Sequence, residues 1–174
     1  KRGKIRDNIF KDVTYFTKYN IEGDERPDNV AHKFYQDSTL DWIILLSNNM
    51  VNVQTEWPLT QESFERYLYD KYETDQNIYS IHHYETKEVK NSLGATVVEK
   101  GLQVPKDFKV EYLDSNLGTY TEVGGVGNLL TTEVTNFQYE VDLDDKKRQI
   151  YVLKQNYLNV VLNDMDRIMP YKTG

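Results

Sequence analysis

Two short apolar helices between residues 22 and 60 place the strongest limit on how this chain folds. Pro27 follows a polar turn and suits the first turn of a helix, where its missing N–H has no partner anyway. Apolar side chains then recur at helical spacing, at Val30, Ala31 and Phe34. A second helix, predicted over residues 40–47, is nearly all apolar on one side. Neither helix is long enough to bury a core alone, so the two must pack together.

Polar and aromatic residues mark the ends of this two-helix unit. Ser38 is predicted to cap the second helix, and a first strand is expected at residues 12–17. Trp42 and Trp57 are interpreted as core residues that hold the two helices together. A third helix is predicted to start at Thr60, as its cap, and to end near residue 72, packed on the two-helix unit.

The middle of the chain has a weaker pattern, and we place a domain boundary at residues 74–77. Short β-rich pieces follow at residues 78–84, 96–98 and 110–113. Residues 114–132 are polar and carry four glycines. Connections of this length are usually mobile or ordered by a partner, and either is the expectation here.

The last third becomes regular again. Apolar and polar residues alternate from Phe137 to Leu143, which predicts a half-buried strand. A turn at residues 144–147 and a second strand at 148–153 then complete a predicted hairpin. The final helix carries an amphipathic stripe of six side chains, and Pro170 helps to end it. These six are Leu158, Val161, Leu162, Met165, Ile168 and Met169.

Charge is unevenly distributed along the 174 residues. Residues 1–11 hold five basic side chains and one acidic one, a net charge of +4. The whole chain has a net charge of −7, so residues 12–174 carry −11. This acidic body argues against nucleic-acid binding, while the basic N-terminal arm suits an acidic partner or solvent. The chain has no cysteine, no apolar run long enough to cross a bilayer and no apparent targeting peptide, which predicts a soluble protein. Its 14 tyrosines are compatible with protein–protein contacts.

No pattern in the sequence predicts catalysis or a bound metal or cofactor. The histidines are His32, His82 and His83, and neighbouring side chains of a strand point to opposite faces, so a shared metal is disfavoured. Asp142, Asp144 and Asp145 are expected to lie at a solvated hairpin tip rather than in a calcium loop. Residues 124–127 lack the Lys and Ser or Thr of a phosphate-binding loop. We therefore predict that the protein is not an enzyme and takes no cofactor or small-molecule substrate.

The pattern GD…P…A…FY.D..L…I…NN within residues 22–60 resembles a LysM module, a β-α-α-β unit. The longer stretch ERPDNVAHKFYQDSTLDWIILLSNNMVNVQTEWPLTQESFERYLYDKY is similar to the baseplate wedge subunit family of T-even-type contractile-tailed bacteriophages, gene product fifty-three. The segment KKRQIYVLKQNYLNVVLNDMDRIM resembles the C-terminal part of the same family. The resemblance covers about residues 9–84 and 134–170.

The resemblance and the residue pattern together predict an α+β fold in three parts. They are a basic arm at residues 1–11, a LysM-like unit with an added helix at 12–73, and a mixed β region at 74–174 closed by a hairpin and a C-terminal helix. The resemblance implies a structural protein of the tail baseplate in the virion, assembled in the host cytoplasm, that joins neighbouring wedges into a six-fold ring around the hub. Its implied partners are other wedge proteins, including the large wedge subunit and the lysozyme-like sheath-initiating subunit. The resemblance also implies that each baseplate contains several copies of the chain, and that the chain binds neither nucleic acid nor membrane.

An alternative stays open: a module that binds peptidoglycan or another N-acetylglucosamine polymer, as LysM modules do. Its groove would lie between the loops at residues 22–26 and 48–56, with Trp57 as the one aromatic residue suited to stack on a sugar. The residues expected to dock a partner are Arg26, Tyr35, Trp57 and Arg148.

Overall fold

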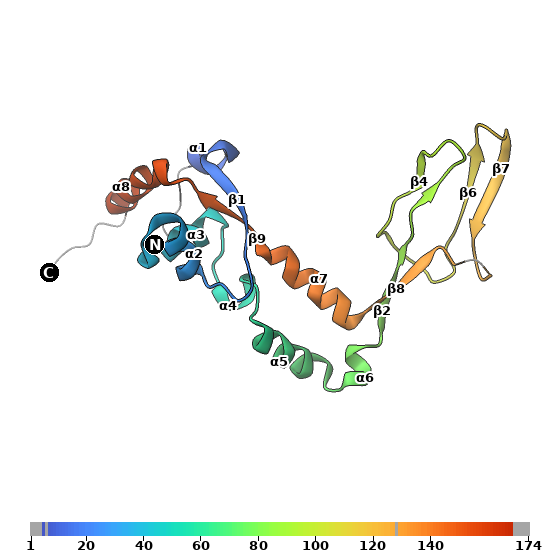
Figure 1. Cartoon of the computed structure of the whole chain (residues 1–174), viewed down its shortest axis with the longest axis horizontal. Coiled ribbons are helices and arrows are strands. Elements are labelled where there is room, and N and C mark those ends of the chain that lie inside the picture. The colour runs from blue at the N-terminus through green and yellow to red at the C-terminus, as the bar shows by residue number, and fades with distance from the viewer. Residues whose placement is uncertain (1–4, 6, 128, 169–174) are drawn as a thin grey trace. The chain divides into compact units, whose positions relative to one another are not determined.

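The computed structural model, which describes residues 5, 7–127 and 129–168, is an α+β chain of two compact units (Figure 1). Unit 1 comprises Lys1–Glu65 and Leu143–Gly174, and unit 2 comprises Arg66–Asp142. The chain thus divides differently from the contiguous expectation of residues 12–73 and 74–174, because the C-terminal segment returns to the N-terminal helices. Residues 1–4 and 6 of the basic N-terminal arm, which hold four of its five basic side chains, lie outside the described residues, as do Met169 and Pro170.

Unit 1 is built mainly from short helices around one antiparallel strand pair. Its elements are α1 (Asp7–Phe10), β1 (Phe16–Asn20), α2 (Pro27–Tyr35), α3 (Asp41–Ser47), α4 (Val53–Glu56), the start of α5 (Gln61–Tyr72), the end of α7 (Asn136–Arg148), β9 (Gln149–Leu153) and α8 (Leu158–Ile168). Its core combines side chains from α2, α3, β9 and α8, among them Val30, Ile43, Ile44, Val152 and Val161. The predicted two-helix packing and the C-terminal amphipathic helix are confirmed.

The partner of the first strand comes from the far end of the chain. β1 pairs antiparallel with β9, from Phe16 opposite Leu153 to Asn20 opposite Gln149. The predicted β-α-α-β order would instead close with a strand soon after α3, but residues 53–56 form the helix α4. The LysM-like arrangement is therefore not confirmed.

Helix and strand starts in unit 1 follow their capping side chains. Asp12 accepts a hydrogen bond from the Thr14 N–H at 2.9 Å and caps a 3-10 turn over Val13–Tyr15, so β1 begins later than the predicted residue 12. In the same way Asp37, rather than Ser38, caps the 3-10 turn that leads into α3. In both places the carboxylate is the side chain that reaches the free backbone N–H groups.

Unit 2 is mostly β-structure, and its elements are the end of α5, α6 (Asp75–Ile78), β2 (Ile81–Thr86), β3 (Val89–Lys90), β4 (Thr96–Val98), β5 (Gln103–Val104), β6 (Lys109–Asp114), β7 (Thr119–Gly124), β8 (Thr131–Thr135) and most of α7. The strands form one three-stranded sheet in the order β5-β2-β8 and two separate pairs, β3–β4 and β6–β7. A small core of Val89, Val98 and Leu130 packs against half-buried residues of β6 and β7. The predicted start of α5 is confirmed, since the Thr60 hydroxyl accepts from the Ser63 N–H at 3.3 Å.

Two predictions for the second half of the chain are wrong. The residues expected to form a hairpin from 137 onward form the helix α7, and only its second strand exists, as β9. The inward face of α7 carries the buried carboxylates Glu140 and Asp144, so the apolar helical pattern is missing from the sequence. The segment 114–132, expected to be mobile or ordered by a partner, instead contains β7, which pairs with β6 of the same chain, and the start of β8. Asp114 and Gly118, with φ of 66°, supply the turn that joins β7 to β6.

None of the helices within residues 7–127 and 129–168 is long and apolar enough to cross a bilayer.

Candidate functional site

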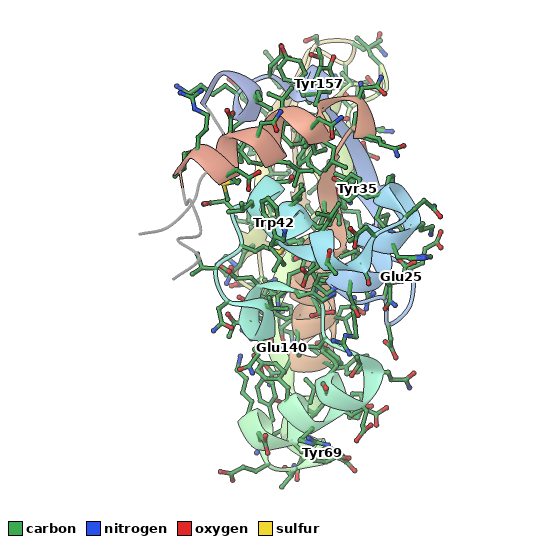
Figure 2. The ribbon with its side chains drawn as sticks, turned by 90° about the vertical axis from the view of Figure 1, so that its left-hand side faces the viewer. Glu25, Tyr35, Trp42, Tyr69, Glu140 and Tyr157 are labelled. Carbon is green, nitrogen blue, oxygen red and sulfur yellow. The ribbon has the colours of Figure 1, made fainter. Side chains whose placement is uncertain are left out.

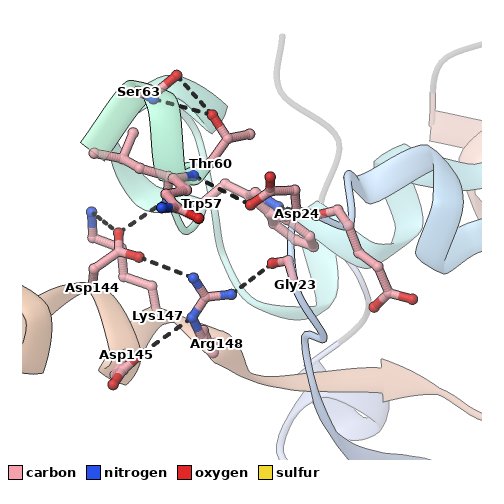
Figure 3. A network of polar contacts seen from close by, with 12 residues as sticks. Gly23, Asp24, Trp57, Thr60, Ser63, Asp144, Asp145, Lys147 and Arg148 are labelled. Carbon is pink, nitrogen blue, oxygen red and sulfur yellow. Dashed lines mark hydrogen bonds and ion pairs between the residues drawn. The ribbon is translucent and has the colours of Figure 1, made fainter. Parts of the chain in front are cut away.

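The turn at residues 22–26 gathers three of the four residues expected to dock a partner. The Trp57 indole donates from Nε1 to the Glu25 carbonyl oxygen at 2.9 Å, and the Arg148 guanidinium donates from Nη1 to the Gly23 carbonyl oxygen at 2.8 Å (Figure 3). Asp24 accepts from the Gln61 N–H at 3.3 Å, which attaches the start of α5 to the same turn. This network joins three segments of unit 1 that are far apart in sequence.

Asp144 extends the network from the last turns of α7. Asp144 is buried, with 7% of the residue exposed, and its carboxylate accepts from the Leu59 N–H at 3.0 Å. It also lies 3.5 Å from Lys147 and 3.6 Å from Arg148, so the buried charge is balanced by two cations. The polar groups around the turn therefore have partners within the chain, which indicates a structural role.

The structure separates the four predicted docking residues by exposure. Trp57 and Tyr35 are each 5% exposed and belong to the core of unit 1. Tyr35 points from α2 toward β9 and donates its hydroxyl to the Leu153 carbonyl at 2.9 Å, and burial raises the pKa of this phenol (Figure 2). Arg26 is largely exposed and pairs with Asp28 at 3.3 Å. Of the four, only Arg26 presents most of its side chain to a partner.

A shallow concavity lies along the β1–β9 pair. It has a volume of about 520 Å³ and is lined by Lys18, Tyr19, Asn20, Gln149, Ile150 and Tyr151. Tyr151 is 39% exposed and offers the aromatic ring that buried Trp57 does not. The concavity lies on strand residues rather than between the two loops where a sugar groove was expected.

In unit 2, a bulge in β2 brings two neighbouring histidines together. The register of β2 against β8 shifts between Ile81 and His83, and the Nδ1 atoms of His82 and His83 lie 2.8 Å apart. His82 also stacks on Tyr139, with ring centroids 3.9 Å apart. The expectation that the two histidines point to opposite faces is therefore wrong. No group of three or more metal-ligating side chains occurs within the described part of the chain.

Glu140 is the centre of a polar cluster between α5 and α7 within unit 2 (Figure 2). Its carboxylate is 3% exposed and accepts hydrogen bonds from Tyr67 at 3.0 Å, Lys71 at 2.6 Å and Tyr72 at 2.8 Å. Burial alone would raise the pKa of Glu140, but these three hydrogen bonds together lower it. The same contacts raise the pKa of Lys71. The cluster thus joins the end of α5 to α7 by one ion pair and by hydrogen bonds from two tyrosines.

The turn end of the β6–β7 hairpin and the neighbouring β3–β4 turn carry four large exposed apolar side chains that we call the apolar tip. Its four members are Leu93 at 66% exposure, Leu113 at 52%, Leu117 at 61% and Tyr120 at 72%. Leu113 and Tyr120 are directly opposite each other across the hairpin and share its outer face. Apolar side chains gathered in this way on a surface indicate a protein-binding site.

Asp114 holds the two turns of the apolar tip together. Its buried carboxylate accepts from the Ser92 N–H at 3.0 Å and the Ser92 hydroxyl at 2.6 Å, on the β3–β4 turn. It also accepts from the N–H groups of Asn116 and Leu117 at 3.0 and 3.4 Å, on its own turn. The hydrogen bonds from Ser92 keep the pKa of Asp114 below its ordinary value. The backbones beside Leu93 and Leu117 are thus fixed by one carboxylate.

The sequence contains indications of the apolar tip beyond those that predicted the helices and strands. Apolar side chains in polar turns, such as Leu93 and Leu117, have no local core to enter. The β-branched and aromatic residues Thr119, Tyr120, Thr121 and Val123 are types that strands favour, and Asp114 to Gly118 has ordinary turn chemistry. The interpretation of residues 114–132 as a loop concealed these features.

The comparisons with known proteins cover both units. A family model described as base plate wedge protein 53 matches residues 7–168. The baseplate wedge protein gp53 of Enterobacteria phage T4 is 23% identical over 165 residues, which cover 90% of this chain and 74% of the phage protein. The family match includes residues 85–133, which the sequence resemblance left out, and so spans the apolar tip. The chain therefore belongs to the base plate wedge protein 53 family.

Proposed function

We propose that this chain is a structural, non-catalytic component of a contractile-tail baseplate that joins neighbouring wedges into the six-fold ring around the hub. Family membership supports a place among baseplate proteins. The proposed partners are other wedge proteins, the large wedge subunit and the lysozyme-like sheath-initiating subunit, with several copies in each baseplate. Assembly takes place in the host cytoplasm before the virion is complete.

The apolar tip is the observation that carries the joining role. Its four side chains are more than half exposed in the single chain, and interfaces that last in an assembly bury such residues. Asp114 fixes the turns beneath them, so docking does not require the surface to be ordered first. In unit 1, by contrast, the polar groups around the turn at residues 22–26 bond to other groups of the same unit, as expected of a unit whose fold does not depend on a partner.

Replacing Leu113 and Tyr120 together by serine tests the joining role. We expect the double variant to bind co-expressed wedge subunits of the same phage at least about tenfold more weakly, because each exposed anchor supplies about 1–2 kcal/mol when buried at an interface. Co-purification and electron microscopy of the assembled particles measure this. The matched control replaces Leu102 and Val126 together by serine. Both side chains are exposed but do not belong to the apolar tip, so the control variant should assemble normally. Equal assembly by both double variants would contradict the proposal.

The concavity on β1–β9 keeps a second function open, the binding of an N-acetylglucosamine polymer. Tyr151 would stack on a sugar ring, and Lys18, Asn20 and Gln149 would supply hydrogen bonds. The baseplate role predicts that the purified chain stays in the supernatant when mixed with insoluble peptidoglycan. Retention in the pellet that is lost in Tyr151→Ala, with folding unchanged by circular dichroism, would favour the sugar-binding function instead.

A further inference from the structure

We propose that the outer edge of β7 binds an extended segment of a partner protein, which adds to the β6–β7 pair as a third strand. This inference rests on the proposed baseplate function and names the chemistry of its partner: a segment that alternates an apolar residue with a lysine or arginine two positions away. The contact would use main-chain hydrogen bonds along β7 and side-chain contacts on the outer face of the hairpin.

The register of the hairpin determines which backbone groups are free. The Gly125 N–H donates to the Phe108 carbonyl at 3.2 Å, and the β6–β7 ladder continues from this bond with a period of two residues. Val110 and Tyr112 therefore direct their backbone groups into the pair, together with Val123 and Thr121 opposite them. The alternating residues of β7, Tyr120 and Glu122, direct their N–H and C=O groups away from β6.

These outward groups have no backbone partner among the described residues. The β6–β7 sheet has two strands, so both of its edges lack a strand neighbour within the described part of the chain. The end of β6 contacts the β3–β4 turn through Asp114 and Ser92, whereas β7 lies on the side of the hairpin away from β4 (Figure 1). A regular six-residue strand with a free edge is a template for pairing with another chain.

The side chains on the outer face define what that chain must carry. Tyr120 is 72% exposed and, with Leu113 opposite it, offers an apolar surface beside the edge. Two positions along, Glu122 lies directly opposite Glu111, and like charges in this arrangement are unfavourable. Lys109 pairs with Glu122 at 3.0 Å, which leaves this face one negative charge in excess. A basic residue beside Glu122 and an apolar residue beside Tyr120 complement both features.

A second copy of this chain complements the edge poorly. If the β7 strands of two copies paired edge to edge, their outer faces would form one continuous surface. Each copy would add its Glu111 and Glu122 carboxylates to that surface. The charge excess would then double rather than be neutralised. A different protein with basic residues in its strand is therefore the favoured occupant.

Hydrogen exchange of the β7 amides tests the inference in the assembled state. We expect the Tyr120 and Glu122 amides to exchange at least about tenfold more slowly after the wild-type chain assembles with co-expressed wedge subunits, because their N–H groups gain acceptors. The Thr121 amide, already bonded within the hairpin, serves as the internal reference. Unchanged exchange at Tyr120 and Glu122 in the assembled protein overturns the edge inference alone. Failure of the wild-type chain to assemble overturns the proposed function, and the edge inference falls with it.

A pair of substitutions at residue 122 isolates the main-chain contribution. Glu122→Pro and Glu122→Ala both remove the carboxylate and the ion pair with Lys109, but only proline removes the outward N–H. We expect the proline variant to assemble at least about tenfold more weakly than the alanine variant, with unchanged exchange at Val110 and Tyr112 showing an intact hairpin. Equal assembly by the two variants contradicts strand addition. A dimer of the wild-type chain alone, seen by light scattering and abolished by Glu122→Pro, would overturn the choice of partner in favour of a second copy.

Discussion

Ending the chain at Asp142 is expected to unfold α2 and α3 as well as to remove β9 and α8. Four side chains of the deleted segment are at most 2% exposed in the core of unit 1: Ile150, Val152, Leu153 and Val161. Burying each contributes about 1.5–3 kcal/mol, so their loss approaches the whole stability of a typical domain, about 5–15 kcal/mol. The deletion also leaves the Tyr35 hydroxyl without its acceptor on Leu153.

Tryptophan fluorescence measures this result directly, since Trp42 and Trp57 both belong to unit 1. The full chain should show a cooperative denaturant transition with buried indole emission, and the truncated chain should show exposed emission without added denaturant. A fragment of residues 1–73 provides the decisive comparison. A cooperative transition in that fragment would mean that the N-terminal unit folds alone, as the contiguous division at residue 73 requires, and would contradict the discontinuous unit.

Replacing Glu140 by alanine is expected to lower the free energy of unfolding of unit 2 by about 2–4 kcal/mol, slightly less than the loss of about 3–5 kcal/mol that follows removal of one partner of a fully buried ion pair. Tyr67, Lys71 and Tyr72 would lose their common acceptor, although Lys71 is 43% exposed and can turn to water. Thermal unfolding followed by circular dichroism measures the loss, and hydrogen exchange across the end of α5 locates it. The control Glu133→Ala changes an exposed carboxylate on β8 and should cost far less. Equal losses in the two variants would contradict a special role for Glu140.

Acid should weaken the same cluster in the wild-type chain. The pKa of Glu140 is lower in the folded protein than the ordinary glutamate value of about 4.3. A carboxyl group with a lowered folded pKa stabilises the fold fully above its unfolded pKa and loses that contribution as the pH falls through the folded pKa. Stability of unit 2 should therefore decrease below about pH 5, and Glu140→Gln should reduce that dependence. A pH profile identical in the variant would show that other carboxylates control acid unfolding.

The sequence by itself determined the local elements whose causes are local. Helices α2, α3, α5 and α8 follow from apolar spacing, from Pro27 and from the Thr60 cap, all within a few residues of the elements they define. The family resemblance depended on these same stretches, and the family match confirms it. The shared feature of these successes is that the residues responsible are neighbours in the chain.

Only the tertiary structure decided the features whose partners are distant in sequence. The strand that completes unit 1 is β9, because the buried side chains of β9 fit the core that α2 and α3 begin. α7 is a helix because Tyr67 and Lys71 satisfy its inward Glu140, and Leu59 satisfies its Asp144, and no local pattern encodes these contacts. Burial of a charge is favourable only when such partners are already in place, so the sequence of α7 is ambiguous until the rest of the chain surrounds it.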